Sequence, residues 1–295
     1  MATSRNNADN LKVFFGHHKC ATSWLTTLMR EYCFRMRQRF GIVHLPRNFE
    51  PFGSISGYVD KHNLDFLAYT NADMEYVEGL DFYRGFHVIR DPRDITVSAY
   101  YSHLSTHGLY PEIAAHRKEL QSLSKNEGLF AEIDFSATEF RELEIWDYNQ
   151  PNVMELKMEV LTKDPENHIS EILNFLGYLD NQNSSGSSIK TFQMKLNRLN
   201  MKGRRYMPGR LPMFPLPTRR YSEIPREVVG EVIDDFSFKK LSGGRKPGQE
   251  NRKSHYRKGK AGDWANHFTE DHKSYFKDKF GDLLIMLGYE KDLNW

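Results

Sequence analysis

The sequence predicts an α/β fold in which helices cover both faces of a central parallel sheet. Short, apolar, β-prone segments alternate with longer segments whose apolar residues recur every three or four positions. Strands that alternate with helices form parallel sheets buried on both faces. The 295 residues suffice for one large domain or two small ones. We predict a single domain over residues 11–295, preceded by a flexible N-terminus, 1–10.

The first predicted strand is Leu11–Phe15, which is short and mostly apolar and is ended by Gly16. From Ala21 a stripe of apolar residues at helical spacing continues as far as Phe40. This pattern predicts the first helix. Four further strands are predicted at residues 41–45, 64–70, 84–90 and 152–158.

Asp91 and Pro92 begin the helix after the fourth strand, because Asp is a favoured cap and Pro is favoured at the first helical position. That helix carries Ser98 and His103. Further helices are predicted at residues 111–123, 137–147, 165–176, 225–236 and 270–287.

Two stretches break this pattern. Residues 180–190 are rich in Ser, Asn and Gly and are typical of a loop. Residues 190–220 are basic, with four prolines and little periodicity. We predict a basic loop or lid insertion near 180–222. A solvated excursion without function is the alternative.

The composition excludes several classes of protein. Lys and Arg number 41 and Asp and Glu 39, a net charge of +2, which argues against a bulk nucleic-acid binder. Cys20 and Cys33 are the two cysteines, too few for a disulfide framework or a four-thiolate zinc site. No apolar run approaches the roughly 20 residues of a membrane span, and the polar N-terminus does not resemble a secretory signal. We expect a cytoplasmic protein.

The turn after the first strand has the features of an anion site. Residues 14–25 read as strand, tight turn and helix start, and free backbone N–H groups at a helix start attract anions. Lys19 adds a full charge, and Thr22 and Ser23 add hydroxyl groups. The phosphate loop of nucleoside triphosphatases needs Gly-x4-Gly-Lys-Ser/Thr, and this turn lacks the second glycine. An ordinary strand–helix turn is the alternative.

Two further basic stretches accompany this turn. Arg90 follows the fourth strand, at the ligand edge of a parallel sheet, and Ser98 lies about two turns along the next helix. An Arg fork with a hydroxyl group suits a phosphate; a surface pair of Arg90 with an Asp is the alternative. In residues 257–264, Arg257 and Lys258 beside Gly259 form a cationic loop suited to wrapping a phosphate.

Together the three stretches resemble the sulfotransferase family. Lys-Cys-Ala-Thr-Ser-Trp-Leu at 19–25 resembles its 5′-phosphosulfate loop. Arg-Asp-Pro-Arg-Asp-x3-Ser at 90–98 is similar to its 3′-phosphate motif. Arg-Lys-Gly-x2-Gly-Asp-Trp at 257–264 resembles its C-terminal signature, which Phe238-Lys-Lys-Leu precedes. The resemblance runs from about residue 11 to Tyr289, with the middle third weakly matched.

The resemblance implies a P-loop-like three-layer α/β/α fold and transfer of a sulfuryl group from 3′-phosphoadenosine 5′-phosphosulfate (PAPS) to a hydroxyl acceptor, leaving 3′-phosphoadenosine 5′-phosphate (PAP). It implies that Lys19 contacts the 5′-phosphate and the bridging oxygen, and that Trp24 and Phe238 flank the adenine. The donor-binding residues that it implies are His18, Lys19, Cys20, Ala21, Thr22, Ser23, Trp24, Arg90, Ser98, Phe238, Arg257, Lys258 and Gly259.

The chain departs from the family pattern at several positions. Ala21 replaces a loop glycine, and we expect it to keep ordinary backbone angles. Met158 stands where many members have a tyrosine on the adenine side. The Lys-Thr-His-Leu-Pro stretch that carries the catalytic histidine of small-molecule members is absent, and the third strand reads Phe-Leu-Ala-Tyr-Thr-Asn at 66–71.

The general base is therefore chosen from the residues themselves. His44 is the first candidate, because it ends the second strand and should emerge at the same sheet edge as Lys19. His17, in the loop, is the second candidate, and both serve with Lys19 as the predicted catalytic residues. The remaining alternatives are His18, His103, His107, His255, Glu50, Asp73 and Glu75.

No metal site is expected, since no histidine pair at helical spacing has an evident carboxylate partner. A nucleotide kinase and a degenerate scaffold that only binds nucleotide or partners are the rival functions. The sequence leaves the oligomeric state open. It also leaves open the acceptor, whether a small molecule, a lipid or a carrier-bound acyl chain.

Overall fold

The computed structural model describes residues 11–108, 110–181, 187–206 and 217–295. They divide into two compact units. Unit 1 comprises residues up to His17, Ala21–Val88 and Asp147–Phe236, and unit 2 comprises His18–Cys20, Ile89–Trp146 and Ser237–Trp295. The predicted N-terminal segment 1–10 lies outside the described residues.

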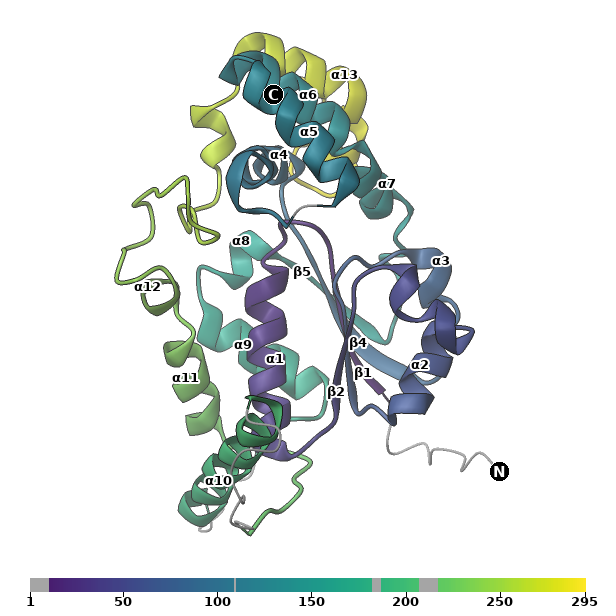
Figure 1. Cartoon of the computed structure of the whole chain (residues 1–295), viewed down its shortest axis with the longest axis vertical. Coiled ribbons are helices and arrows are strands. Elements are labelled where there is room, and N and C mark those ends of the chain that lie inside the picture. Colours follow the sequence, from purple (N-terminus) through teal and green to yellow (C-terminus); the bar gives the residue numbers. More distant parts are fainter. Residues whose placement is uncertain (1–10, 109, 182–186, 207–216) are drawn as a thin grey trace. The chain divides into compact units, whose positions relative to one another are not determined.

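Unit 1 is built on a five-stranded sheet with the order β2-β3-β1-β4-β5 (Figure 1). Its strands are β1 (Leu11–Gly16), β2 (Phe40–Val43), β3 (Phe66–Tyr69), β4 (Tyr83–Ile89) and β5 (Val153–Lys157). The pairs β1–β3, β1–β4 and β2–β3 are all parallel. The predicted α/β fold with a central parallel sheet is confirmed.

Helices cover both faces of this sheet. The helices of unit 1 are α1 (Thr22–Met36), α2 (Ile55–His62), α3 (Met74–Val77), α8 (Met158–Leu161), α9 (Pro165–Phe175), α10 (Ser187–Tyr206) and α11 (Arg226–Asp235), with short turns η1 (Pro46–Asn48) and η2 (Glu50–Phe52). In Figure 1, α1 and α9 lie on one side of the sheet and α2 and α3 on the other.

The alternation of side chains along the strands divides the core between the two faces. Phe14, Phe66 and Phe86 pack with the buried side of α1 and with α9 and α11. On the opposite face Tyr69 meets Phe49, with ring centroids 6.2 Å apart. Since both faces are buried, the strands carry the nearly continuous apolar runs seen in the sequence.

The register brings the carboxyl ends of the strands to one edge of the sheet. Phe15 is opposite Tyr69 of β3, and Gly16 is opposite Val88 of β4. His17 and His44, the two base candidates, follow β1 and β2 directly and so belong to this edge.

The prediction for residues 190–220 was partly wrong. Ser187–Tyr206 form the helix α10, in which Met194 and Asn197 are fully buried. The Asn197 side-chain amide donates to the backbone oxygens of Arg35 (2.9 Å) and Arg219 (2.6 Å). The sequence pattern did not predict this helix, because one of its buried residues is the polar Asn197 and basic residues occupy much of its surface. Residues 182–186 and 207–216 of the predicted insertion lie outside the described residues, and its role as a lid stays a prediction.

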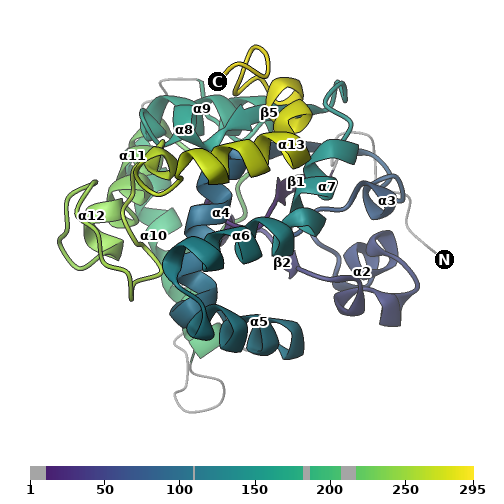
Figure 2. The same cartoon turned by 90° about the horizontal axis from the view of Figure 1, so that it is seen from above.

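Unit 2 is mainly helical. Its helices are α4 (Pro92–Tyr101), α5 (Pro111–Ser122), α6 (Lys125–Phe135), α7 (Ala137–Ile145), α12 (Phe238–Leu241) and α13 (Glu270–Met286), with the π-helical turn η3 (Ser102–Thr106) and the 3-10 turn η4 (Asp263–Asn266). Asp91 caps α4 as predicted and accepts from the N–H of Arg93 at 2.9 Å. Figures 1 and 2 show α13 beside α6, with which it packs.

Within the part of the chain that the structure describes, no helix is both long enough and apolar enough to cross a bilayer.

Candidate active site

The first two predicted stretches are in contact in unit 2. The Arg90 guanidinium donates to the backbone oxygen of Lys19 at 3.1 Å. Arg90 is buried, and its Nε has no hydrogen-bond partner among the described residues. A buried guanidinium donor without a partner is costly unless a ligand completes it. The alternative of an Arg–Asp pair holds in part, because Arg90 lies 3.9 Å from Asp94, but the pair is buried and not at the surface.

Asp94 connects this pair to the C-terminal stretch. Its carboxylate accepts from the backbone N–H groups of Gly262 (2.7 Å) and Trp264 (2.9 Å). The same carboxylate lies 3.9 Å from the Arg90 guanidinium. Asp94 is 1% exposed, so these contacts are shielded from water. One buried carboxylate thus ties the start of α4 to the Gly-rich loop.

Asp263 holds the cations of the third stretch. It accepts from Arg257 at 2.6 Å and from Lys258. Although burial favours the protonated form, the hydrogen bonds from Lys258 and Arg257 hold the pKa of Asp263 well below its usual range. The three basic stretches are therefore connected within unit 2, through Arg90, Asp94 and Asp263.

Gly259 sits on the ring of Phe238. A Cβ at this position would lie 2.5 Å from a carbon of that ring, and the backbone φ is +61°. Both facts favour glycine. The structure thus brings together Phe238 and the 257–259 loop, two parts of the predicted adenine and 3′-phosphate contacts. Ser98 lies half-buried on α4.

Lys19 lies in a strongly positive environment. Burial and the nearby charge of Arg90 together lower the pKa of its ammonium to about 8, while Glu132 opposes the change. The side chain remains largely cationic at neutral pH. Several cations gathered around one loop create a local positive potential that attracts an anion.

The loop after β1 is strained. Lys19 has φ +61° and Ala21 has φ +58°, the left-handed region that L-residues with a Cβ avoid. The expectation that Ala21 keeps ordinary backbone angles is wrong. Alanine thus adopts here a conformation that glycine adopts freely, at a cost of roughly 1 kcal/mol.

Relief of this strain is testable. We expect Ala21→Gly to raise the free energy of unfolding by up to about 1 kcal/mol, since glycine adopts positive φ without a steric penalty. Denaturant titration measures this change. The control Ala115→Gly, at an exposed position of α5, should instead lose about 1 kcal/mol. An equal loss in the free energy of unfolding for Ala21→Gly and Ala115→Gly would show that the backbone at Ala21 is not strained.

The rest of the predicted loop contacts are placed at the start of α1 in unit 1. Thr22 donates its hydroxyl to the backbone oxygen of His17 at 2.6 Å, and Ser23 is exposed. Trp24 donates its indole N–H to the Phe236 oxygen at 3.0 Å. In unit 2, Cys20 is buried and its thiol lies 3.5 Å from the His18 oxygen.

His17 is buried and belongs to a chain of three polar groups. Its Nε2 lies 2.7 Å from Nε2 of His87, and Nδ1 of His87 lies 2.6 Å from a Glu155 carboxylate oxygen. An ionised Glu155 accepts from His87 Nδ1–H, so the other ring nitrogen of a neutral His87 accepts from His17. These two hydrogen bonds fix the position of His17, the residue that begins the loop.

The buried, hydrogen-bonded His87 makes the free energy of unfolding depend on pH. Burial, together with the charge of His17, holds the pKa of His87 well below its usual value near 6.5. The unfolded chain therefore binds a proton below about pH 6.5 that folded His87 does not bind. The contribution of neutral His87 to the free energy of unfolding is therefore complete above about pH 6.5 and is lost as the pH falls below it.

We expect His87→Asn to flatten this dependence. Asparagine keeps a donor toward Glu155 and does not titrate. Between pH 6.5 and 5.5 the wild type should lose about 1 kcal/mol more stability than the variant. Denaturant titrations at the two pH values measure the difference, and parallel losses would show that His87 is not the responsible group.

His44 is oriented by its neighbour on the sheet edge. Thr70 donates its hydroxyl to the Val43 oxygen at 3.2 Å, so at its 2.9 Å contact with His44 Nδ1 it acts as acceptor. This assigns the hydrogen of His44 to Nδ1 and leaves Nε2 with its lone pair. His44 is half-buried, and Asn48 fixes its backbone N–H at 2.9 Å.

Sequence reasoning missed several residues of this region. His87, Glu155 and Glu132 belong to no motif, and the sequence suggests Asp94 only as a surface partner of Arg90. A single histidine inside the apolar strand 84–90 was the available signal for His87. For Glu132 no signal existed, because its partners His103 and His116 lie 29 and 16 residues away.

The comparison with solved structures gives distant matches. Mouse sulfotransferase SULT7A1 complexed with PAP is 16% identical, with 95% of this chain and 85% of that chain covered and a TM-score of 0.48. A retinol dehydratase in complex with androsterone and PAP is 15% identical, with 92% and 80% covered and a TM-score of 0.48. Among curated proteins no match is found.

The comparison with protein-family models is decisive. The model described as the sulfotransferase domain matches residues 84–205 and 219–288, more than half of the chain. The match includes Arg90, Ser98 and the 257–259 loop and begins after the Lys19 turn. The chain therefore belongs to the sulfotransferase family.

Proposed function

We propose that the protein transfers a sulfuryl group from PAPS to a hydroxyl acceptor. The observation that carries the proposal is the connected set of cations in unit 2. Arg90 contacts the Lys19 backbone, and Asp94 and Asp263 extend the set to Arg257 and Lys258. A donor with anionic groups at both its 3′ and 5′ ends needs such separated cations.

The residues fit this donor. Arg90 has a buried guanidinium nitrogen without a partner among the described residues, as expected of a donor reserved for a ligand. Gly259 is exposed and lets the loop backbone lie directly against the Phe238 ring. The side chains assigned to the ligand itself are cations and hydroxyl groups, which suit phosphate and sulfate, while Asp94 and Asp263 hold the surrounding segments in place.

Each residue has a proposed task. Arg90, Ser98, Arg257, Lys258 and Gly259 bind the 3′-phosphate; Lys19, with Thr22 and Ser23 from the same loop, binds the 5′-phosphate. His18, Cys20 and Ala21 shape that loop, and Trp24 and Phe238 flank the adenine. When bound, PAPS supplies an activated sulfuryl group and leaves as PAP. Lys19 stabilises the charge that develops on the bridging oxygen.

His44 is the proposed general base. Its Nε2 lone pair, set by the Thr70 contact, accepts the proton of the acceptor hydroxyl. Half-burial leaves the ring within reach of an acceptor, whereas His17 is 1% exposed and its Nε2 is engaged with His87. We assign His17 a positioning role toward the Lys19 loop.

The 3′-phosphate assignment is tested by comparing two ligands. We expect Arg90→Ala to weaken PAP binding about 30-fold and AMP binding much less, because AMP lacks the 3′-phosphate and a buried charge-assisted hydrogen bond is worth about 2 kcal/mol. Isothermal titration calorimetry measures both. Arg84→Ala, at the exposed start of β4, is the matched control. Equal losses for PAP and AMP would reject the assignment.

Transfer itself is tested with labelled donor. Incubation of the protein with ³⁵S-PAPS and a cell extract should give a labelled product, and Lys19→Met should remove it. PAP binding without transfer to any acceptor would favour a degenerate scaffold instead. Tighter binding of ATP–magnesium than of PAP would favour a kinase.

The sequence-based expectations for partners and place remain part of this proposal. We propose a small hydroxyl compound, a lipid or a carrier-bound acyl chain as acceptor, no nucleic-acid partner, and a cytoplasmic location. Cell fractionation tests the location.

A further inference from the structure

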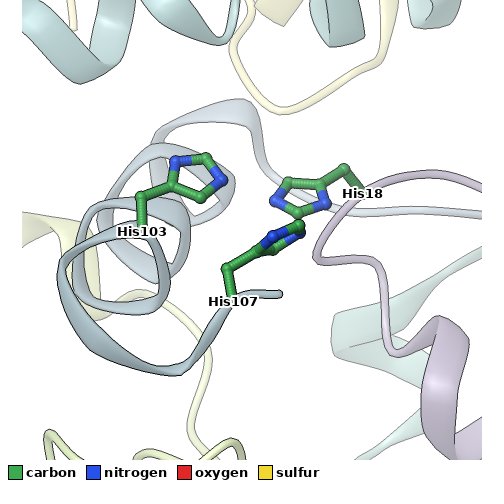
Figure 3. Close-up of side chains that lie close together, drawn as sticks. All are labelled: His18, His103 and His107. Carbon is green, nitrogen blue, oxygen red and sulfur yellow. The ribbon is translucent and has the colours of Figure 1, made fainter. Parts of the chain in front are cut away.

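A second cluster of functional groups lies in unit 2, beside the loop that carries Lys19. The rings of His18, His103 and His107 face one another, and Figure 3 shows a nitrogen of His103 pointing toward the other two rings. One nitrogen from each ring lies within 4.8 Å of the others. The ring centroids of His18 lie 5.3 Å from those of both His103 and His107.

The π-helical turn η3 creates this arrangement. His107 donates its backbone N–H to the Ser102 oxygen at 2.8 Å, the five-residue bond of a π-turn. Two histidines four residues apart thereby present their rings on one side, 5.2 Å between centroids. Arg117 donates to the backbone oxygens of both His103 and His107, and these hydrogen bonds stabilise the turn.

The outer ring nitrogens are already engaged. Nδ1 of His103 lies 3.0 Å from a carboxylate oxygen of Glu132, which is completely buried. Nδ1 of His107 lies 2.9 Å from the oxygen of Gly108. Both contacts place the hydrogen on Nδ1 and leave Nε2 as the electron-pair donor, the tautomer of metal-bound histidine with a carboxylate or carbonyl behind it.

The inner nitrogen of His103 lacks a partner. His103 is 1% exposed, and its Nε2 has no hydrogen bond to any described residue. A buried imidazole nitrogen carrying a lone pair is unfavourable when nothing binds it. This nitrogen points into the cluster, where a bound cation would accept its lone pair.

We propose that His18, His103 and His107 bind one divalent transition-metal ion, and that the ion is Zn²⁺. Imidazole nitrogens suit zinc, and three histidines with an open fourth position match a zinc site that keeps a water or ligand. The sequence predicted no metal site, because the carboxylate partner of His103 lies 29 residues further on and the third ligand comes from another element. This proposal does not depend on PAPS being the donor.

The site is tested with metal alone. Protein stripped with chelator and dialysed against Zn²⁺ should retain one ion per chain, and Co²⁺ in its place should give the visible absorption of tetrahedral cobalt. His107→Gln should abolish both signals. Glu132→Gln should weaken zinc binding roughly 10- to 100-fold, as expected for a group that only orients a ligand.

A matched control covers another acidic and histidine cluster. Glu250, Asp263 and His267 also lie close enough to hold an ion, so His267→Ala should leave zinc binding unchanged. Retention of zinc by His107→Gln with loss in His267→Ala would overturn the proposal, and so would absence of binding in the wild type. Circular dichroism of each variant shows whether it is folded, and His18→Ala provides a second ligand deletion should His107→Gln fail to fold.

Discussion

Replacing Lys19 with methionine should lower the rate of sulfuryl transfer about 1,000-fold, equivalent to roughly 4 kcal/mol of transition-state stabilisation. Methionine keeps a similar flexible stem and the backbone oxygen that Arg90 contacts, while it removes the charge. Because the developing charge is largest in the transition state, we expect kcat to fall far more than PAP affinity. Steady-state kinetics with labelled PAPS, together with calorimetry of PAP, measure both quantities.

The control is Lys163→Met, which removes an exposed lysine of unit 1 and should leave kcat unchanged. A Lys19→Met enzyme with more than a tenth of wild-type kcat would contradict the assigned role. A matched loss of PAP affinity with unchanged kcat would place Lys19 in ground-state binding alone.

Replacing His44 with asparagine should lower kcat several hundred-fold, within the usual range for loss of a general base. Asparagine retains an N–H toward Thr70, so the strand end keeps its contact while the Nε2 lone pair is lost. The wild-type rate should fall toward acidic pH as the imidazole is protonated, and the variant should lack that acidic limb. Measurement of kcat between pH 5 and 9 tests both expectations.

His17→Gln is the matched control for the base. Glutamine keeps a donor toward His87, so the positioning chain survives. We expect a modest rise in KM with the acidic limb intact. If the acidic limb of the pH–rate profile is lost in His17→Gln and kept in His44→Asn, then His17 is the general base and His44 is not.

Much of the fold follows from local pattern. Apolar runs bounded by turn residues predicted all five strands, and the Asp91–Pro92 pair marked the start of α4 to the residue. The pattern failed at α10, where basic residues dominate the count although Met194 and Asn197 are buried. Helix α6 was also missed, although Ser124 and Glu127 form a capping box at its start.

The cationic stretches could be predicted because their residues are close in sequence. What joins them could not, since Asp94 reaches Gly262 across 168 positions. For the same reason the contacts of Glu132 with His103 and of Glu155 with His87 could not be predicted, because the partners are far apart in the sequence. Ala21 shows a different limit, because its identity predicted ordinary backbone angles and the loop imposes a left-handed conformation.

The most direct test of the account is a crystal structure of the protein with PAP. The 3′-phosphate should lie within hydrogen-bond distance of Arg90 and Arg257, and the 5′-phosphate within hydrogen-bond distance of Lys19. Clear density for PAP at any other surface, with these three side chains left in contact with protein alone, would contradict it.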